Sequence, residues 1–152
     1  MSTIASTTGN TQAIGVAYAD QNIVNSDMVY VNATGGQIGY TTGAANLPST
    51  VTQLTSKSTG VTINASCGQI VTFATSIAAA GEASFVVTNS MVSAYDIPMV
   101  AIASGAANAV TYAISVGAVA NGSFAIVISN LSAGTLSEAL TINFGILHVA
   151  QV

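Results

Sequence analysis

TYAISVGAVANGSFAIVISN, residues 111–130, decides the fold of this chain, and it carries no charged side chain. Apolar side chains alternate with small or polar ones on both sides of Asn121-Gly122, which is the two-residue period of a half-buried strand. Asn-Gly between two alternating runs is the strongest short hairpin signal. A membrane helix would need about 18 or more apolar residues without that alternation. The stretch is therefore predicted to form a β-hairpin and not a membrane segment.

Runs of the same kind recur further along the chain, separated by turns rich in Gly, Asn, Ser and Ala. They are GVTIN (60–64), GQIVTFAT (68–75), ASFVVTN (83–89), IPMVAIAS (97–104) and ALTINFGILHV (139–149). Short strands at such spacing indicate a β-sandwich or barrel. We expect an all-β, jelly-roll-like β-sandwich over residues 55–152. The one helical turn expected in this region lies around Ser76–Ala80.

Residues 1–54 differ in composition, being richer in Gly, Thr and Asn, with only two modest apolar runs, AIGVAY and MVYV. We expect them to form an extended N-terminal arm or peripheral strands that reach neighbouring subunits, with Leu47-Pro48-Ser49 as a hinge. The start, MSTIASTTGNTQ, has neither the basic region nor the apolar block of a signal peptide, which favours synthesis in the cytoplasm.

Charge is scarce, since only 4% of residues are charged against about 25% in an ordinary soluble domain. Lys57 is the single Lys or Arg, and the formal net charge is −4. The acids are Asp20, Asp27, Glu82, Asp96 and Glu138. One cation cannot displace counterions from nucleic acid, bind an anionic membrane or clamp a phosphate, so these partners and reactions are not expected.

The exterior also lacks charge. A 15.0 kDa monomer exposes about 7,000 Å² of surface, so its six charged side chains correspond to about one charge per 1,200 Å² of surface. Outward strand positions hold apolar residues as well, as at Val127, Leu147 and Val149. Such a surface is typical of a protein covered by identical copies or by another protein, so we expect an assembly component.

The candidates for chemistry are few. His148 with Asp96 or Glu138 and a serine could form a nucleophilic triad, but no nucleophile-elbow motif accompanies them. Glu82 and Glu138 could form a glycosidase pair, but each precedes a strand in a turn, where a solvated charge is the commoner case. One His, one Cys and five scattered acids match no metal-binding spacing. We therefore predict no enzyme activity and no catalytic, cofactor-binding or metal-binding residues.

Lys57, in TSKSTG, could form an intramolecular isopeptide bond with an Asn, but a solvated loop lysine or an intersubunit salt bridge is favoured. Cys67 is expected to be a small buried apolar side chain that forms no intrachain disulfide. Five tyrosines could stack on sugars but are too dispersed to predict a site; they are Tyr18, Tyr30, Tyr40, Tyr95 and Tyr112. Four sequons, at Asn32, Asn64, Asn121 and Asn130, are expected to be unused.

Three stretches, TSKSTGVTINASCGQI (55–70), ASFVVTNSMVSAYDIPMV (83–100) and GSFAIVISNLSAGTLSEALTINFGIL (122–147), carry a family likeness. Over roughly residues 50–149 the chain resembles a group of small tailed-bacteriophage virion structural proteins. The resemblance implies a capsid decoration (cement) protein or a tail-associated one, and it brings no catalytic residues. We expect a homotrimer on the capsid surface of the virion that clamps neighbouring major capsid subunits. The alternative is a tail or fibre protein whose loop tips, such as AGTLSE and GAAN, bind host glycans.

Overall fold

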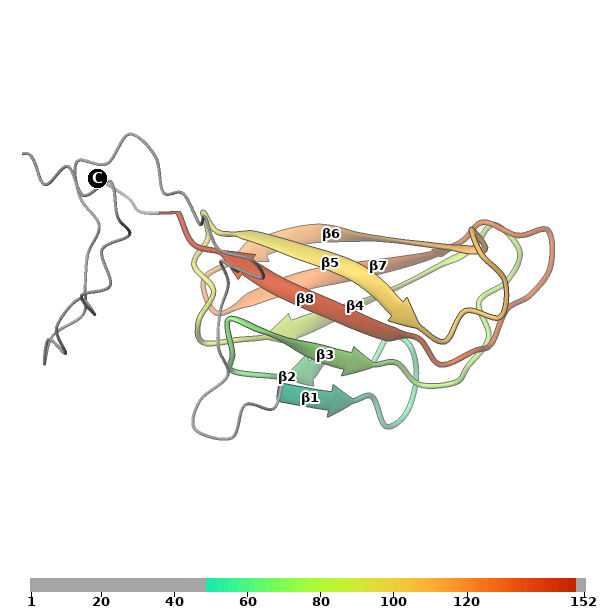
Figure 1. Ribbon diagram of the computed structural model, residues 1–152, viewed down its shortest axis with the longest axis horizontal. Helices are drawn as coiled ribbons and strands as arrows, with labels where there is room; N and C mark the ends of the chain where they lie inside the picture. The colour runs from blue at the N-terminus through green and yellow to red at the C-terminus, as the bar shows by residue number, and fades with distance from the viewer. Residues whose placement is uncertain (1–48, 150–152) are drawn as a thin grey trace, which may run out of the picture. The chain divides into compact units, whose positions relative to one another are not determined.

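The computed structural model describes residues 49–149, and every structural statement below concerns that range. It contains eight strands and no helix (Figure 1). The strands are β1 (Ser49–Thr52), β2 (Val61–Thr62), β3 (Cys67–Val71), β4 (Glu82–Thr88), β5 (Ile97–Ser104), β6 (Tyr112–Ala120), β7 (Ser123–Asn130) and β8 (Thr141–Leu147). The all-β prediction is confirmed for this range.

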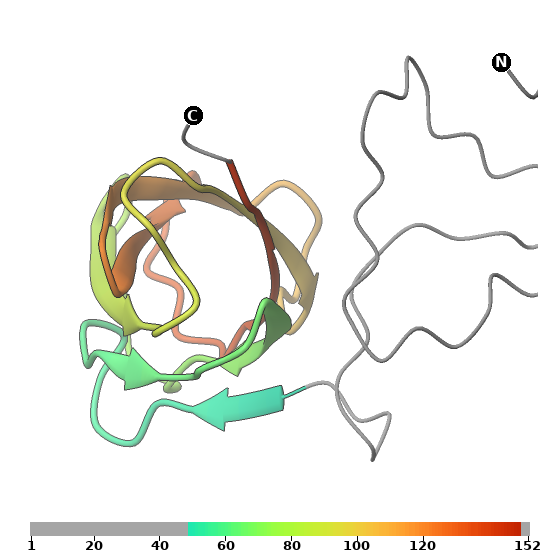
Figure 2. The ribbon, with the colours of Figure 1, turned by 90° about the vertical axis from the view of Figure 1, so that its left-hand side faces the viewer.

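The strands form two four-stranded sheets, in the orders β1-β3-β8-β5 and β2-β4-β7-β6. Viewed along the strands, the two sheets face each other around a common interior (Figure 2). Both sheets are mixed, because β1–β3 and β2–β4 are parallel pairs while the remaining pairs are antiparallel. A regular jelly roll is built from antiparallel strands, so the jelly-roll detail of the prediction stays a prediction.

The core follows from the two-residue period of the strands. The fully or almost fully buried side chains of the long strands are Ile70, Phe85, Val87, Phe124, Ile126, Ile128, Ile142, Phe144 and Ile146. Phe124 on β7 and Phe144 on β8 join the two sheets, with ring centroids 5.8 Å apart. Burial of each such side chain stabilises the fold by roughly 1.5–3 kcal/mol, so this layer holds the two sheets together.

The predicted hairpin is present as β6 and β7, whose last pair before the turn is Ala120 with Ser123. Gly122 adopts a φ of 79°, which a residue with a Cβ rarely tolerates. A bulge near Gly117 shifts the register between Val116 and Ala118. The stretch that resembled a membrane segment therefore forms two paired strands, and no helix in the described range is long and apolar enough to span a membrane.

The prediction of a helical turn at Ser76–Ala80 is wrong. Ile77 instead forms an isolated antiparallel bridge with Leu136, with N–H···O distances of 2.8 and 3.0 Å in the two directions. Its side chain is 4% exposed, so burial against the core and pairing with a distant segment override the local helical tendency. Ala80 has a φ of 54°, which is incompatible with a helix.

The last part of the segment expected to be an extended arm or peripheral strands, residues 1–54, includes a strand at the edge of the sheet β1-β3-β8-β5. β1 begins at Ser49 and pairs along its whole length with β3, from Ser49 opposite Gly68 to Thr52 opposite Val71. Residues 49–52 thus form an edge strand, as the peripheral-strand alternative expected. The rest of the predicted arm, residues 1–48, with Leu47 and Pro48 of the hinge, lies outside the described residues.

Candidate functional site

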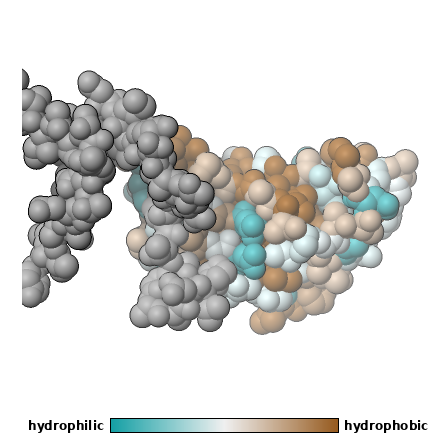
Figure 3. Space-filling view, in the orientation of Figure 1, coloured by the Kyte–Doolittle hydropathy of each residue, from teal (hydrophilic) through white to brown (hydrophobic). Residues whose placement is uncertain are grey.

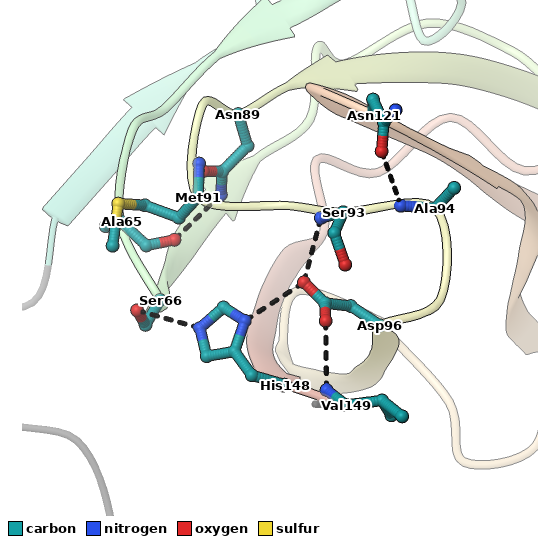
Figure 4. A network of polar contacts seen from close by, with 10 residues as sticks. All are labelled: Ala65, Ser66, Asn89, Met91, Ser93, Ala94, Asp96, Asn121, His148 and Val149. Atoms are coloured by element: carbon teal, nitrogen blue, oxygen red, sulfur yellow. Dashed lines mark hydrogen bonds and ion pairs between the residues drawn. The ribbon is translucent and has the colours of Figure 1, made fainter. Parts of the chain in front are cut away.

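One polar cluster lies at the end of the molecule where β4 and β8 end and β5 begins (Figure 4). We call it the Asp96 cluster; it comprises Ser66, Ser93, Asp96, His148 and the backbone of Val149. Three separate segments supply these residues: the loop before β3, the loop between β4 and β5, and the residues that follow β8. The cluster brings together the only histidine of the chain and one of its five acids.

Asp96 is the centre of the cluster, and its side chain is 2% exposed, whereas that of His148 is 40% exposed. Its Oδ2 accepts hydrogen bonds from the Ser93 N–H (2.8 Å) and from His148 Nδ1 (2.9 Å), and its Oδ1 accepts one from the Val149 N–H (3.1 Å). The pKa of Asp96 lies far below its usual value, chiefly because of the Ser93 N–H; burial opposes this and the other donors add to it. Asp96 is therefore ionised, and Nδ1 of His148 must carry the proton it donates.

His148 also points toward a serine, with Nε2 lying 3.5 Å from Ser66 Oγ. Carboxylate, imidazole and hydroxyl thus follow one another in the order of a serine nucleophile triad. The sequence had suggested His148 and Asp96 but could not select Ser66 among many serines. The Ser66–His148 distance is at the outer limit for a hydrogen bond.

A surface depression of about 90 Å³ lies away from the Asp96 cluster, on the outer face of the sheet β2-β4-β7-β6. It is lined by Val86, Ala118, Ala120, Ser123, Phe124 and Ala125.

Asparagine side chains fix the loop that carries Asp96. Asn89 donates to the Ala65 carbonyl (2.7 Å) and accepts from the Met91 N–H (2.9 Å). Asn121 of the hairpin turn accepts from the Ala94 N–H (2.9 Å), and Asn64 accepts from the Ser90 N–H (2.9 Å). The sequon residues Asn64 and Asn121 therefore hold this loop in place.

A second polar cluster, which we call the Lys57 cluster, lies where β1 and β3 end and β8 begins. Lys57 is 1% exposed, and its Nζ donates to the backbone carbonyls of Phe73 (2.8 Å), Thr75 (2.7 Å) and Glu138 (2.7 Å). All three ammonium protons are thus bound. Burial lowers the pKa of Lys57, and the negative charge of Glu138 opposes that shift.

The expectation of a solvated lysine or an intersubunit salt bridge is therefore wrong. The segments that enclose the ammonium lie 16, 18 and 81 residues away in the chain, so the sequence around Lys57 gives no sign of them. Since its three donors all bind carbonyl oxygens, the amine is also held away from the attack on an amide carbon that an isopeptide bond requires.

Between residues 49 and 149 the two remaining acids accept hydrogen bonds from different hydroxyl groups, while Asp20 and Asp27 lie outside the described residues. Glu138 Oε2 accepts from Tyr112 Oη (2.6 Å), and Glu82 Oε1 accepts from Ser129 Oγ (2.9 Å). The Tyr112 hydrogen bond lowers the pKa of Glu138, while burial, together with this bond, raises the pKa of Tyr112. Each carboxylate thus has its own hydroxyl donor.

Two further residues that the sequence singled out, Cys67 and Asn130, lie in or beside strands of the described range. Cys67 is half-buried at the start of β3, and Asn130 is buried with its Nδ2 donating to three backbone carbonyls. No three His, Cys, Asp or Glu side chains between residues 49 and 149 lie close enough to hold a metal ion. Tyr18, Tyr30, Tyr40 and Asn32 lie outside the described residues.

The surface offers a further candidate, an apolar stripe next to the Asp96 cluster, formed by outward residues of β5 and β8 together with Tyr95 before β5 and Val149 after β8. It comprises Tyr95, Ile97, Met99, Leu147 and Val149, which are between 41% and 65% exposed. Ile97 pairs with Leu147 across the two strands, and Met99 pairs with Gly145. Apolar surface is visible along β5 in the space-filling view (Figure 3). The sequence had indicated Leu147 and Val149 as outward apolar residues, but not that Leu147 lies opposite Ile97 on β5.

No protein family, no curated protein and no solved structure matches this chain. The likeness to small bacteriophage virion proteins therefore stays a prediction, and the function must be inferred from the surface and from the two clusters.

Proposed function

We propose that this chain is a non-enzymatic structural protein of a bacteriophage virion, a capsid decoration (cement) protein that clamps neighbouring major capsid subunits. Its location would be the capsid surface, and its partners would be the major capsid protein and other copies of itself, in a homotrimer. The proposed fold for this role is a jelly-roll-like sandwich with an extended N-terminal arm. Eight strands in two four-stranded sheets support that fold, and the two parallel pairs are where it departs from the regular form.

The observation that carries the proposal is the almost complete absence of ionised groups on the described surface. Four of the six charged side chains fall in the described range, and two of these, Lys57 and Asp96, are buried. Glu138 is half-buried, so Glu82 is the one exposed charged side chain of Lys, Arg, Asp or Glu between residues 49 and 149. A freely dissolved surface normally carries charges on about a quarter to a third of its residues.

Large apolar side chains occupy part of the surface that lacks charge. Those at least 37% exposed are Leu54, Phe73, Val86, Met91, Tyr95, Ile97, Met99, Val110, Leu131, Leu147 and Val149. Covering them with protein would release bound water and stabilise the assembly by about 25 cal/mol per Å² of apolar area. A decoration protein works in this way, since it adds buried area across the joints between shell subunits and needs no chemistry of its own.

The two polar clusters suit such a role because they hold the loops at both ends of the sandwich. Among the described residues, every buried side-chain nitrogen or oxygen has a hydrogen-bond partner. A module with fixed loops loses little conformational entropy when it docks, so more of the contact energy appears as affinity.

The number of copies per particle tests the proposal. Quantitative mass spectrometry of purified virions whose genome encodes this chain should give hundreds of copies per particle, in fixed ratio to the major capsid protein. A handful of copies would favour the tail or fibre alternative. Absence of the chain from particles would overturn both.

A further inference from the structure

The turn of the β6–β7 hairpin contains the single Asn-Gly step of the 152-residue sequence, Asn121-Gly122. The side chain of Asn121 is exposed, so water reaches it. Glycine has no Cβ, and its backbone nitrogen can therefore approach the preceding asparagine side chain without the steric hindrance that other residues impose. Among the asparagines of this chain, Asn121 is thus the one whose side chain is best placed to react with its own backbone.

The reaction is deamidation, and its co-reactant is water. The nitrogen of Gly122 loses its proton to the solvent and attacks Cγ of Asn121. The bond that forms between this nitrogen and Cγ replaces the bond between Cγ and Nδ2, which leaves as ammonia, and a cyclic succinimide remains. Water then opens the ring at one or the other carbonyl group. The product at position 121 is aspartate, or isoaspartate when the backbone continues through the former side chain.

In the folded chain both reacting groups are bound to the loop between β4 and β5. The Gly122 N–H donates to the Val92 carbonyl at 2.8 Å, which holds the proton that must leave. Oδ1 of Asn121 accepts from the Ala94 N–H at 2.9 Å, which holds the side chain that must turn toward the Gly122 nitrogen (Figure 4). The Gly122 carbonyl also accepts from the Asn89 N–H at 2.8 Å. Attack therefore requires this loop to separate from the turn.

The position of the loop depends in turn on Asp96. Its Oδ2 accepts from the N–H of Ser93, the residue between Val92 and Ala94, at 2.8 Å. The same carboxylate binds two donors of the segment that follows β8. Opening of the loop is thus coupled to the Asp96 cluster. A reaction that the closed form does not permit proceeds at a rate set by the population of such local openings.

We propose that Asn121 is a modification site at which the loop 89–94 gates deamidation, so that the reaction proceeds when the Asp96 end of the sandwich opens locally. This inference goes beyond the proposed function and does not depend on it. Aspartate at position 121 adds an exposed carboxylate to a described surface on which Glu82 is the one exposed Lys, Arg, Asp or Glu. Isoaspartate lengthens the backbone of the turn by a carbon atom, which displaces Gly122 from its partners in the loop. The modification therefore loosens this end of the sandwich irreversibly.

The test follows deamidation of the full-length chain at mildly alkaline pH. Peptide mapping by mass spectrometry measures the fraction of aspartate and isoaspartate at each asparagine position over time, in the folded chain and in the chain unfolded with guanidinium chloride. Two folded variants complete the comparison. Asp96→Asn weakens the hold on the Ser93 N–H, whereas the matched control Glu138→Gln removes an equal charge beside the Lys57 cluster at the opposite end. Circular dichroism confirms that both variants are folded at the temperature used.

We expect Asn121 to react faster than every other asparagine in the unfolded chain, and at least about tenfold more slowly in the folded chain. Asp96→Asn should accelerate the reaction of the folded chain, and Glu138→Gln should not. A faster reaction at another asparagine of the unfolded chain would overturn the site. Equal rates in the folded and unfolded chains would overturn the gating, and equal rates in the two variants would overturn its coupling to Asp96. The capsid proposal is decided separately by copy number.

Discussion

The two ends of the sandwich carry polar clusters that differ in solvent exposure. The difference distinguishes side chains that only stabilise the fold from side chains that a binding partner can contact. In the Lys57 cluster the ammonium is 1% exposed and all of its donors bind main-chain carbonyls. In the Asp96 cluster the carboxylate is equally enclosed, but His148 remains 40% exposed and the apolar stripe begins beside it. An enclosed group can only stabilise, whereas a half-exposed one lies where a second molecule can reach it.

The largest expected effect is that of Lys57→Met. Methionine fills most of the space but removes the donor that Lys57 gives to three carbonyl oxygens, of which that of Phe73 keeps the Thr75 N–H at 2.9 Å. We therefore expect the free energy of unfolding to fall by about 3–5 kcal/mol. Urea denaturation followed by circular dichroism measures the change. The control is Ser58→Ala at the exposed neighbouring position, where a change within about 0.5 kcal/mol is expected. A stable Lys57→Met protein would show that the ammonium is not what ties these segments together.

A smaller loss is expected from Asp96→Asn at the other end. The amide keeps one acceptor oxygen but turns an N–H₂ toward at least one of the donors from Ser93, His148 and Val149. We expect the melting temperature to fall by about 5 °C, less than for Lys57→Met. Calorimetry measures the melting temperature of both variants. A larger decrease for Asp96→Asn than for Lys57→Met would contradict the conclusion that Lys57 contributes more to stability.

Lowering the pH should weaken the Asp96 cluster more than the Lys57 cluster, because the Asp96 carboxylate becomes protonated whereas the Lys57 ammonium keeps its charge. Because the folded-state pKa of Asp96 lies below the unfolded value of about 3.9, the unfolded chain binds more protons as the pH falls through that range. The stabilisation is therefore complete above about pH 5 and is lost as the pH falls below about 4. Stability measured from pH 7 to pH 2 should decline less steeply in Asp96→Asn. Glu138→Gln, which removes another carboxylate with a lowered pKa, should leave the Asp96 part of the decline in place.

The smallest expected effect is that of Ser66→Ala. Its hydroxyl lies 3.5 Å from His148 Nε2, so its loss should change stability by no more than about 0.5 kcal/mol. The same residue tests the absence of enzyme activity. A fluorophosphonate, which a reactive serine attacks with loss of fluoride, should leave the full-length chain unmodified by mass spectrometry. An adduct on Ser66 that Asp96→Asn abolishes would instead identify a working triad.

The strands could be predicted because their evidence is local. Alternation over 111–130 and the Asn121-Gly122 turn contain the whole hairpin signal, and the run 97–104 matches β5 residue for residue. Lys57 could not be placed, because its partners come from segments up to 81 residues away. The sequence also did not identify Ser66 as the neighbour of His148, although a prediction that β3 pairs with β8 would have placed the two residues close together. Since Cys67 pairs with Gly145, the residues just before β3 must lie near those that follow β8.

The position of β8 has a consequence for how the chain acquires its structure. β8 is the last strand in the sequence, yet it lies inside its sheet between β3 and β5. Before residues 141–147 emerge from the ribosome, β3 has one neighbour, the four-residue β1, and β5 has no partner in its own sheet. Pairs so distant along the chain form slowly, because much of the polypeptide must be closed into a loop first. Completion of this sheet therefore has to follow the synthesis of β8, and a nascent chain ending before residue 141 would leave the apolar side of β5 exposed to aggregation.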